Sequence, residues 1–321
     1  MNFENTLLIT GGTAGLGYEA ALSIARAKPK SLVVLSSRSD KNHAADSINK
    51  TLGQKNTIYI PLDLADQKNV RAYAKEWSTR GYPPIQALLL NAGLQFPGEL
   101  TRTVDGLEAT FGINHIGNAL LFHLLCPYLA NNARIISTAS GTHDPAQISG
   151  LPDAEYTTAE ELAHPTSKTI NYSGRQRCAT SKLCNILWIY SLDRHLKKQA
   201  SERSITATAF DPGLMPGSGL AREAGPVLRF FWTRIMPHMI PLMKKILSPN
   251  IHTMKESGES LAGVAIDPEL QGVSGEYFEG RKPIKSSIDS YDEAKQEDLW
   301  QWTINYLAQG EEEREKFEQL R

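Results

Sequence analysis

The feature that most constrains the fold is a glycine-rich turn between a strand and a helix near the N-terminus. The stretch "LLITGGTAGLGYEAA" (7–21) places Gly11, Gly15 and Gly17 directly after an apolar run and at the start of a helical pattern. Glycines let the backbone turn tightly there and approach a pyrophosphate, while the helix N-terminus offers free N–H groups. This context predicts a dinucleotide-binding turn, and a plain tight turn is the alternative.

Apolar runs alternate with helical patterns along the rest of the chain. Strands are predicted over 6–10, 31–37, 57–64, 85–93, 133–140 and 204–213, and helices over 17–27, 70–80, 106–129 and 176–198. Continuous Val/Ile/Leu strands between helices favour a parallel sheet that is buried on both faces. We therefore expect one α/β domain over 1–321, with a doubly wound, Rossmann-type sheet that binds ligands at the carboxyl ends of its strands.

Composition and charge exclude several other classes of protein. The net charge of -1 gives no reason to expect a nucleic-acid partner. Three sparse cysteines without metal-ligand spacing indicate reduced thiols and no metal site. The N-terminus enters a strand at once, and no run approaches the roughly 18 apolar residues that span a bilayer. We expect a cytoplasmic protein.

The end of the second predicted strand, "LSSRSD" (35–40), bears on the choice of cofactor. An acid about 20 residues after the turn usually binds a free ribose 2′-OH, whereas an arginine accommodates a 2′-phosphate. Arg38 occupies this region, so the sequence favours NADP. Asp40 remains the alternative, as a ribose ligand for NAD, and Arg38 would then be only a solvated charge.

Six motifs in order resemble those of the short-chain dehydrogenase/reductase family. They are "TGGTAGLG" (10–17), "LDL" (62–64), "NAG" (91–93), "GINHIGNALL" (112–121), "RIISTAS" (134–140) and "DPGLMPGSGL" (211–220). The resemblance implies an oxidoreductase with a nicotinamide cofactor. It also implies that the cofactor is bound by Gly11, Thr13, Gly15, Leu16, Gly17, Asp63, Leu64, Asn91, Ala92, Gly93, Lys182, Pro212 and Gly213.

Within this family the chain is similar to the retinol-dehydrogenase-like and protochlorophyllide-reductase-like branch. The similarity rests on "SKLCN" (181–185), the "PG…GL" stretch and a long segment after it. It implies a bulky, apolar substrate, and some members of the branch lie on membrane surfaces. Family members often form dimers through helix faces, so a homodimer is a further possibility.

The catalytic residues implied by the resemblance are Asn114, Ser140 and Lys182, together with a tyrosine four residues before the lysine. Cys178 stands in the tyrosine position here. In the family the tyrosine protonates the carbonyl oxygen, the serine holds that oxygen, and the lysine binds the nicotinamide ribose and lowers the tyrosine pKa. The asparagine supports a water-linked proton relay through the lysine.

Cys178 differs from tyrosine in acidity and in reach. A thiol has a pKa of about 8.5 against about 10 for a phenol, and we expect Lys182 to lower the pKa of Cys178 further, toward a thiolate that cannot donate a proton. From covalent bond lengths, the sulfur ends about 4 Å short of a phenolic oxygen. A general acid needs about 2.6–3.2 Å or one bridging water.

Four interpretations of Cys178 stay open. The cysteine is a natural or introduced loss that leaves a weak enzyme, or the protein still reduces its substrate with a water on Cys178 or with Tyr172 as the acid. The thiol is a nucleophile toward an enone, or the cofactor and pocket serve a non-redox role. Cys126 and Cys184 fall in apolar helical patterns and are expected in the core.

Two segments lie outside the predicted sheet. Residues 214–255 are expected to form a lid, and residues 285–321 a helical C-terminal extension. The stretch 226–247 combines aromatic, Met and basic residues and lies in a region without acids between Glu223 and Glu256. This pattern favours a lid over an apolar substrate pocket, and peripheral contact with an anionic membrane is the alternative.

Overall fold

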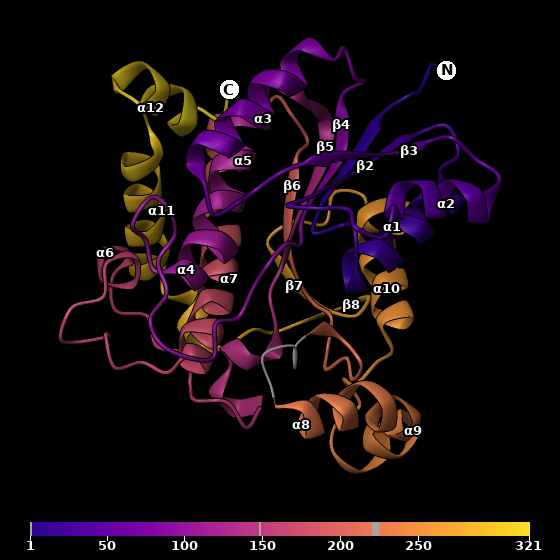
Figure 1. Ribbon diagram of the computed structural model, residues 1–321. Coiled ribbons are helices and arrows are strands. Elements are labelled where there is room, and N and C mark those ends of the chain that lie inside the picture. Colours follow the sequence, from indigo (N-terminus) through magenta and orange to yellow (C-terminus); the bar gives the residue numbers. More distant parts are fainter. Residues whose placement is uncertain (1, 148, 220–224) are drawn as a thin grey trace.

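A computed structural model of the chain describes residues 2–147, 149–219 and 225–321. Within these residues one eight-stranded sheet lies between two layers of helices (Figure 1). The strands are β1 (Thr6–Thr10), β2 (Leu32–Ser37), β3 (Thr57–Pro61), β4 (Ile85–Leu90), β5 (Leu129–Thr138), β6 (Thr206–Asp211), β7 (Glu276–Glu279) and β8 (Lys282–Ile284).

The sheet has the order β3-β2-β1-β4-β5-β6-β7-β8. Neighbouring strands are parallel except for the β7–β8 pair, which is antiparallel. The chain moves outward from β1 in one direction through β2 and β3, and then from β4 in the other direction. The carboxyl ends of β1 and β4 therefore form a topological switch point, where ligands of such sheets bind. This arrangement confirms the predicted doubly wound, Rossmann-type single domain.

The apolar runs of the strands are explained by burial on both faces of the sheet. Leu8 on β1 belongs to one large apolar cluster, whereas Leu7 and Ile9 belong to a second cluster on the opposite face. Successive side chains of a strand point to opposite faces, so a strand covered on both sides needs apolar residues at every position.

One layer contains α1 (Gly15–Ala27), α2 (Ala44–Leu52) and α10 (Met254–Ile266), and the other contains α3 (Gln67–Thr79), α5 (Asn118–Leu125) and α7 (Gly174–Gln199) (Figure 1). The short helices α4 (Ala109–Phe111) and α6 (Ala159–Ala163) lie beside α7 and α11 respectively. Within 285–321, α11 (Glu293–Leu307) packs against α7, and α12 (Glu311–Glu318) follows it.

The sequence prediction of one helix over 106–129 needs correction. Gly112–Gly117 forms a π-helical segment between α4 and α5, and Leu129 already belongs to β5. A Cβ on Gly117 would lie 2.3 Å from the carbonyl oxygen of Leu64, so the helix approaches the loop after β3 too closely for any side chain there. The elements α2, α10, β7 and β8 were not predicted.

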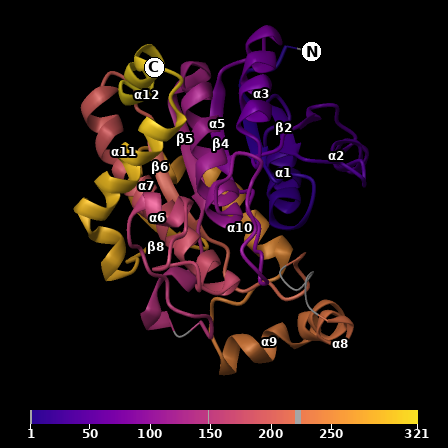
Figure 2. The same cartoon turned by 60° about the vertical axis from the view of Figure 1, so that its left-hand side comes forward.

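The segment after β6 leaves the sheet and forms α8 (Pro226–Phe230), a π-helical turn (Phe231–Ile235) and α9 (Met236–Ile246). Figures 1 and 2 both place α8 and α9 at the lower edge of the molecule, apart from the helices that cover the sheet. Among the described residues no helix has both the length and the apolar character needed to cross a membrane.

Candidate active site

The glycine-rich turn after β1 adopts backbone angles and a close approach that only glycine readily permits. Gly11 and Gly15 have φ angles of 67° and 54°, and a Cβ on Gly17 would lie 2.4 Å from the Gly11 carbonyl oxygen. Ala14, the N-cap residue of α1, offers no capping side chain, so the first N–H groups of the helix point outward without a side-chain acceptor. A phosphate fits this position because it would accept those hydrogen bonds.

Contacts around the turn fix the neighbouring strand end. The Thr13 and Ser37 hydroxyls lie 2.8 Å apart, and this contact joins the turn to the end of β2. Leu16, on α1, is buried. Arg38 follows at an exposed position, and its side chain forms no ion pair or hydrogen bond with the described residues. Asp40 is already engaged, because its Oδ1 accepts a hydrogen bond of 2.7 Å from the Ala44 amide at the start of α2.

The predicted adenine end lies at the carboxyl end of β3. Asp63 Oδ1 accepts from the Ala65 amide at 3.0 Å, and the Asp63 amide donates to Asn69 Oδ1 at 2.7 Å. Leu64 is buried beside the helix that starts near Asn114. These bonds hold the loop after β3 in one conformation, with the Asp63 side chain only partly buried.

Asn91, Ala92 and Gly93 join the ends of β4 and β1 at the switch point. The Asn91 amide nitrogen Nδ2 donates to the Thr10 carbonyl, and the Ala92 backbone N–H donates to the Thr10 hydroxyl, both at 2.9 Å. A Cβ on Gly93 would lie 3.2 Å from Asn114 Oδ1 and 3.4 Å from Lys182 Nζ. Gly93 therefore brings two predicted catalytic side chains to the same strand end.

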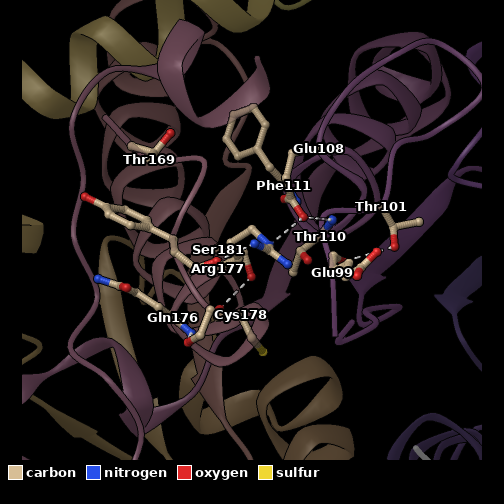
Figure 3. A network of polar contacts seen from close by, with 12 residues as sticks. Glu99, Thr101, Glu108, Thr110, Phe111, Thr169, Gln176, Arg177, Cys178 and Ser181 are labelled. Carbon is tan, nitrogen blue, oxygen red and sulfur yellow. Dashed lines mark hydrogen bonds and ion pairs between the residues drawn. The ribbon is translucent and has the colours of Figure 1, made fainter. Parts of the chain in front are cut away.

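Asn114 is held in the π-helical segment by hydrogen bonds on both sides of its amide. Its Oδ1 accepts from the Leu94 N–H at 2.7 Å, and its Nδ2 donates to the Leu94 carbonyl and to the Ser181 hydroxyl, both at 3.0 Å. Ser181 in turn donates to the Cys178 carbonyl at 2.7 Å, as drawn in Figure 3. A π-helical insertion often marks a functional site, and here it carries the predicted Asn.

Lys182 is partly buried on α7, and its Nζ donates to the Thr138 carbonyl at the end of β5, 2.9 Å away. Asn185 donates to the same carbonyl at 3.1 Å. Ser140 lies two residues after Thr138. Its hydroxyl caps the next turn by accepting a hydrogen bond from the Thr142 amide at 3.3 Å. The structure thus brings Asn114 and Lys182 to the end of β5, two residues before Ser140.

The Pro212–Gly213 turn closes the end of β6. Gly213 has a φ of 72°, and its N–H donates to Oδ1 of the buried Asp211 at 2.9 Å. Asn250 donates to Asp211 Oδ2 at 2.8 Å, and the Ser257 hydroxyl donates to the Pro212 carbonyl at 2.6 Å. Leu220, the last residue of the motif that includes this turn, lies outside the described residues.

Comparisons with known proteins agree with this geometry. Residues 5–151 match the family model described as short chain dehydrogenase. Human polyprenol dehydrogenase is 27% identical over 92% of this chain and 83% of its own, and the WW domain-containing oxidoreductase of Drosophila melanogaster is 29% identical over 95% and 68%. A blue fluorescent protein from a metagenomic library, solved with NADPH, has the same fold, with 20% identity, a TM-score of 0.60 and coverage of 88% and 99%.

The chain is similar to short-chain dehydrogenases over most of its length. The motifs at the strand ends lie where doubly wound sheets bind dinucleotides. The family model ends before α7, so the match does not include Cys178 and Lys182.

Cys178 lies on α7 one turn before Lys182 and is partly exposed. Burial raises the pKa of the Cys178 thiol above its ordinary value, and the Lys182 ammonium offsets only part of that rise. Burial also lowers the pKa of Lys182. The expected thiolate is thus corrected: desolvation exceeds the attraction to Lys182, and the thiol keeps its proton at neutral pH.

Tyr172, the other candidate proton donor, precedes α7 and lines a small cavity with Glu108, Arg177, Thr180 and Ser181. Cys178 and Lys182 are not among the residues that line this cavity. Burial, with Glu155 nearby, raises the pKa of Tyr172 to about 12. Figure 3 shows the Cys178 sulfur pointing away from Arg177 and Glu108, the charged pair beside this cavity.

Sequence reasoning missed several residues that position the site. Ser181 links Asn114 to α7, and Asp211 holds the Pro212–Gly213 turn. His143 Nδ1 donates to the Ser140 carbonyl at 2.7 Å, and its Nε2 accepts from the Ser287 N–H at 3.0 Å. This bonding fixes the neutral ring with the proton on Nδ1, in agreement with a pKa that burial lowers. Only Asp211, inside the "DPG" stretch, carried a local signal.

Proposed function

We propose that the protein is an NADP(H)-dependent oxidoreductase that interconverts a bulky, apolar carbonyl or enone and its reduced form. The observation that carries the proposal is the meeting of Asn114, Lys182 and Gly93 at the carboxyl end of β4, beside the end of the strand that precedes Ser140. The family uses four catalytic positions together. Three of them hold the expected residues, Asn114, Ser140 and Lys182, and the fourth holds Cys178 in place of tyrosine. The bound nicotinamide would supply or accept the hydride.

Arg38 supports NADP rather than NAD. Its exposed guanidinium follows β2 beside Ser37, which bonds to the phosphate-binding turn, and it is free to meet a 2′-phosphate. The competing ribose ligand, Asp40, already accepts a hydrogen bond from the Ala44 amide. The solved relative that binds NADPH is consistent with this choice.

Cys178 is proposed as the proton donor, directly or through one water. A neutral thiol has a proton to give, whereas the thiolate needed for addition to an enone is disfavoured by burial. The sulfur stops about 4 Å short of a phenolic oxygen, so a bridging water is needed for most carbonyl positions. Lys182 and Asn114 would hold the ribose and the relay, and Ser140 would hold the substrate oxygen.

The apolar substrate class is supported by the lid segment. Among the described residues, Met236, Ile240, Met243 and Ile251 form a separate apolar cluster beside the Pro212–Gly213 turn. Methionine packs adaptably against irregular apolar ligands. This cluster therefore favours a large, apolar substrate over a small, polar one.

The test is NADPH oxidation by the parent, Cys178→Tyr and Cys178→Ala on a panel of apolar ketones, aldehydes and enones. NADPH binding by fluorescence titration is measured in the same samples. We expect slow turnover by the parent, a gain of about 10²–10⁴ for Cys178→Tyr, and a loss for Cys178→Ala, because a positioned acid contributes that much.

The outcomes separate the proposal from its alternatives. If all three proteins bind NADPH and none turns over, the scaffold serves a non-catalytic role. If the parent turns over and Cys178→Tyr does not, the thiol or the space beside it belongs to the mechanism in another way. If none binds NADPH, the cofactor assignment and the proposed function fail together.

A further inference from the structure

The helical segment after β6 carries most of the large apolar side chains that are exposed in the described part of the chain. Among the described residues fourteen such side chains are exposed, and nine of them lie between Val227 and Leu247. Val227 and Leu247 are 83% and 69% exposed. Soluble proteins rarely gather so many apolar side chains in one short stretch unless that stretch meets another apolar surface.

These side chains form a stripe along one side of the segment. Phe231, Ile235, Met239, Leu242 and Ile246 follow one another at spacings of four or three residues and are all exposed. Such spacing aligns side chains along one face of a helix.

The side of the segment next to this stripe is attached to the protein. Ile240 and Met243 are buried against Ile251, and the Trp232 indole donates to the Ser218 carbonyl at 3.0 Å. The segment is therefore anchored to the protein while its apolar stripe faces outward. Figures 1 and 2 show α8 and α9 at the outer edge of the molecule, beyond the carboxyl ends of the strands.

The charge of the segment indicates what covers the stripe. No Asp or Glu occurs from Gly225 to Lys255, whereas Arg229, Arg234 and Lys245 are exposed. Lys244 pairs with Glu256 at 3.0 Å, just beyond the segment. An apolar stripe flanked by cations, with no acid, is complementary to a bilayer surface that contains anionic lipids.

We propose that the segment Pro226–Ile246 docks this protein on the surface of an anionic lipid bilayer. The apolar stripe enters the region between headgroups and acyl chains, and the arginines and lysine contact lipid phosphates. The helix lies in the plane of the surface, since no described helix is able to span the membrane.

Docking would also place the candidate active site next to the bilayer. Leu214, directly after the Pro212–Gly213 turn, forms a β-bridge with Ile251, which lies shortly after the end of the segment. A lipophilic substrate would then enter from the membrane without crossing water. This second part rests on the proposed function, whereas docking itself stands on the segment alone.

The experiment is flotation of the full-length protein with vesicles of phosphatidylcholine, with and without phosphatidylserine. We expect binding to the mixed vesicles that weakens as salt rises, and little binding to phosphatidylcholine alone. The double variant Phe231→Ser/Ile246→Ser should bind about tenfold more weakly or worse, through loss of buried apolar area. Arg229→Gln/Arg234→Gln should lose a similar factor on the mixed vesicles only.

The matched control is Val104→Ser/Ile288→Ser, which removes apolar side chains that are 76% and 94% exposed elsewhere on the surface. It should bind like the parent. Circular dichroism and urea unfolding check that every variant is folded, which we expect because all the altered side chains are exposed.

Two results would overturn docking. One is equal flotation of the parent and both segment variants. The other is a dimer in light scattering that Phe231→Ser/Ile246→Ser dissociates, without flotation of the parent, which would make a second copy the partner. NADPH turnover measured on the same samples separates the two proposals. Flotation without turnover refutes the function only, and turnover without flotation refutes the docking only.

Discussion

Acid should destabilise this protein through two histidines buried behind the candidate active site. His115 and His123 are 2% and 1% exposed, and burial lowers the pKa of each to about 3. His115 directly follows Asn114, and its Nε2 lies 3.0 Å from the Thr303 hydroxyl. His123 stacks on Phe317 at 4.7 Å between ring centroids, and neither of its ring nitrogens has a hydrogen-bond partner among the described residues.

The direction and size of the effect follow from linkage. An unfolded histidine has a pKa of about 6.5, so as the pH falls below that value the unfolded chain binds protons that the folded protein cannot. Stability is therefore full above about pH 6.5 and falls progressively toward pH 3. At pH 5.0 each group costs about 2 kcal/mol, or about 4 kcal/mol for the pair, against a typical total of 5–15 kcal/mol.

The substitution His123→Phe isolates one of the two contributions. It keeps a planar ring in the aromatic cluster, so urea unfolding at pH 7.5 should show a gain of about 1 kcal/mol from removal of unpaired ring nitrogens. The fall in unfolding free energy between pH 7.5 and pH 5.0 should shrink by about 2 kcal/mol. His238→Gln, at an exposed position of α9, is the control. An unaltered fall in His123→Phe would refute the reasoning.

Three further predictions concern the candidate site. Gly17→Ala should abolish NADPH binding in a fluorescence titration, since its Cβ would lie 2.4 Å from the Gly11 carbonyl oxygen; Gly98→Ala, with open space, is the control. Arg38→Ala should raise the Kd for NADPH by about 10- to 100-fold and leave the Kd for NADH unchanged, because a charge-assisted hydrogen bond is worth about 1.5–3 kcal/mol. An equal loss of affinity for both cofactors would refute the role of Arg38 at the 2′-phosphate. Asn250→Ala, which leaves an oxygen of the buried Asp211 unpaired, should lower the unfolding free energy by about 1–3 kcal/mol in urea, and an unchanged midpoint would contradict that role.

The sheet and the cofactor turn were predictable because their signals are local. Continuous apolar strands report burial on both faces, and the glycines after β1 report backbone angles that other residues rarely adopt. The strands β7 and β8 were missed because they have only four and three residues, too short for a period to emerge. The π-helical segment was missed because its residues look as helical as those of α5.

The site was predictable only as far as the motif positions reach. The chain order placed Asn114, Ser140 and Lys182 on the correct strand ends and helices, although their roles stay predictions. The protonation state of Cys178 was misjudged, because a neighbouring charge is visible in a sequence and the depth of burial is not. Asn250, which bonds to Asp211, and Ser287, which bonds to His143, lie 39 and 144 residues away along the chain. No local sequence pattern could therefore predict these hydrogen bonds.

The bond from His143 to Ser287 has a consequence for how the protein is made. A ribosome adds about 5–20 residues per second, so Ser140 emerges on the order of ten seconds before Ser287 does. During that interval the nascent chain has Asn114, Ser140 and the cofactor turn, but the imidazole that holds the Ser140 carbonyl lacks its second anchor. Synthesis thus delays this contact until β7, β8 and the following turn have arrived, and a chain truncated before Ser287 would contain the candidate catalytic residues without the second anchor of His143.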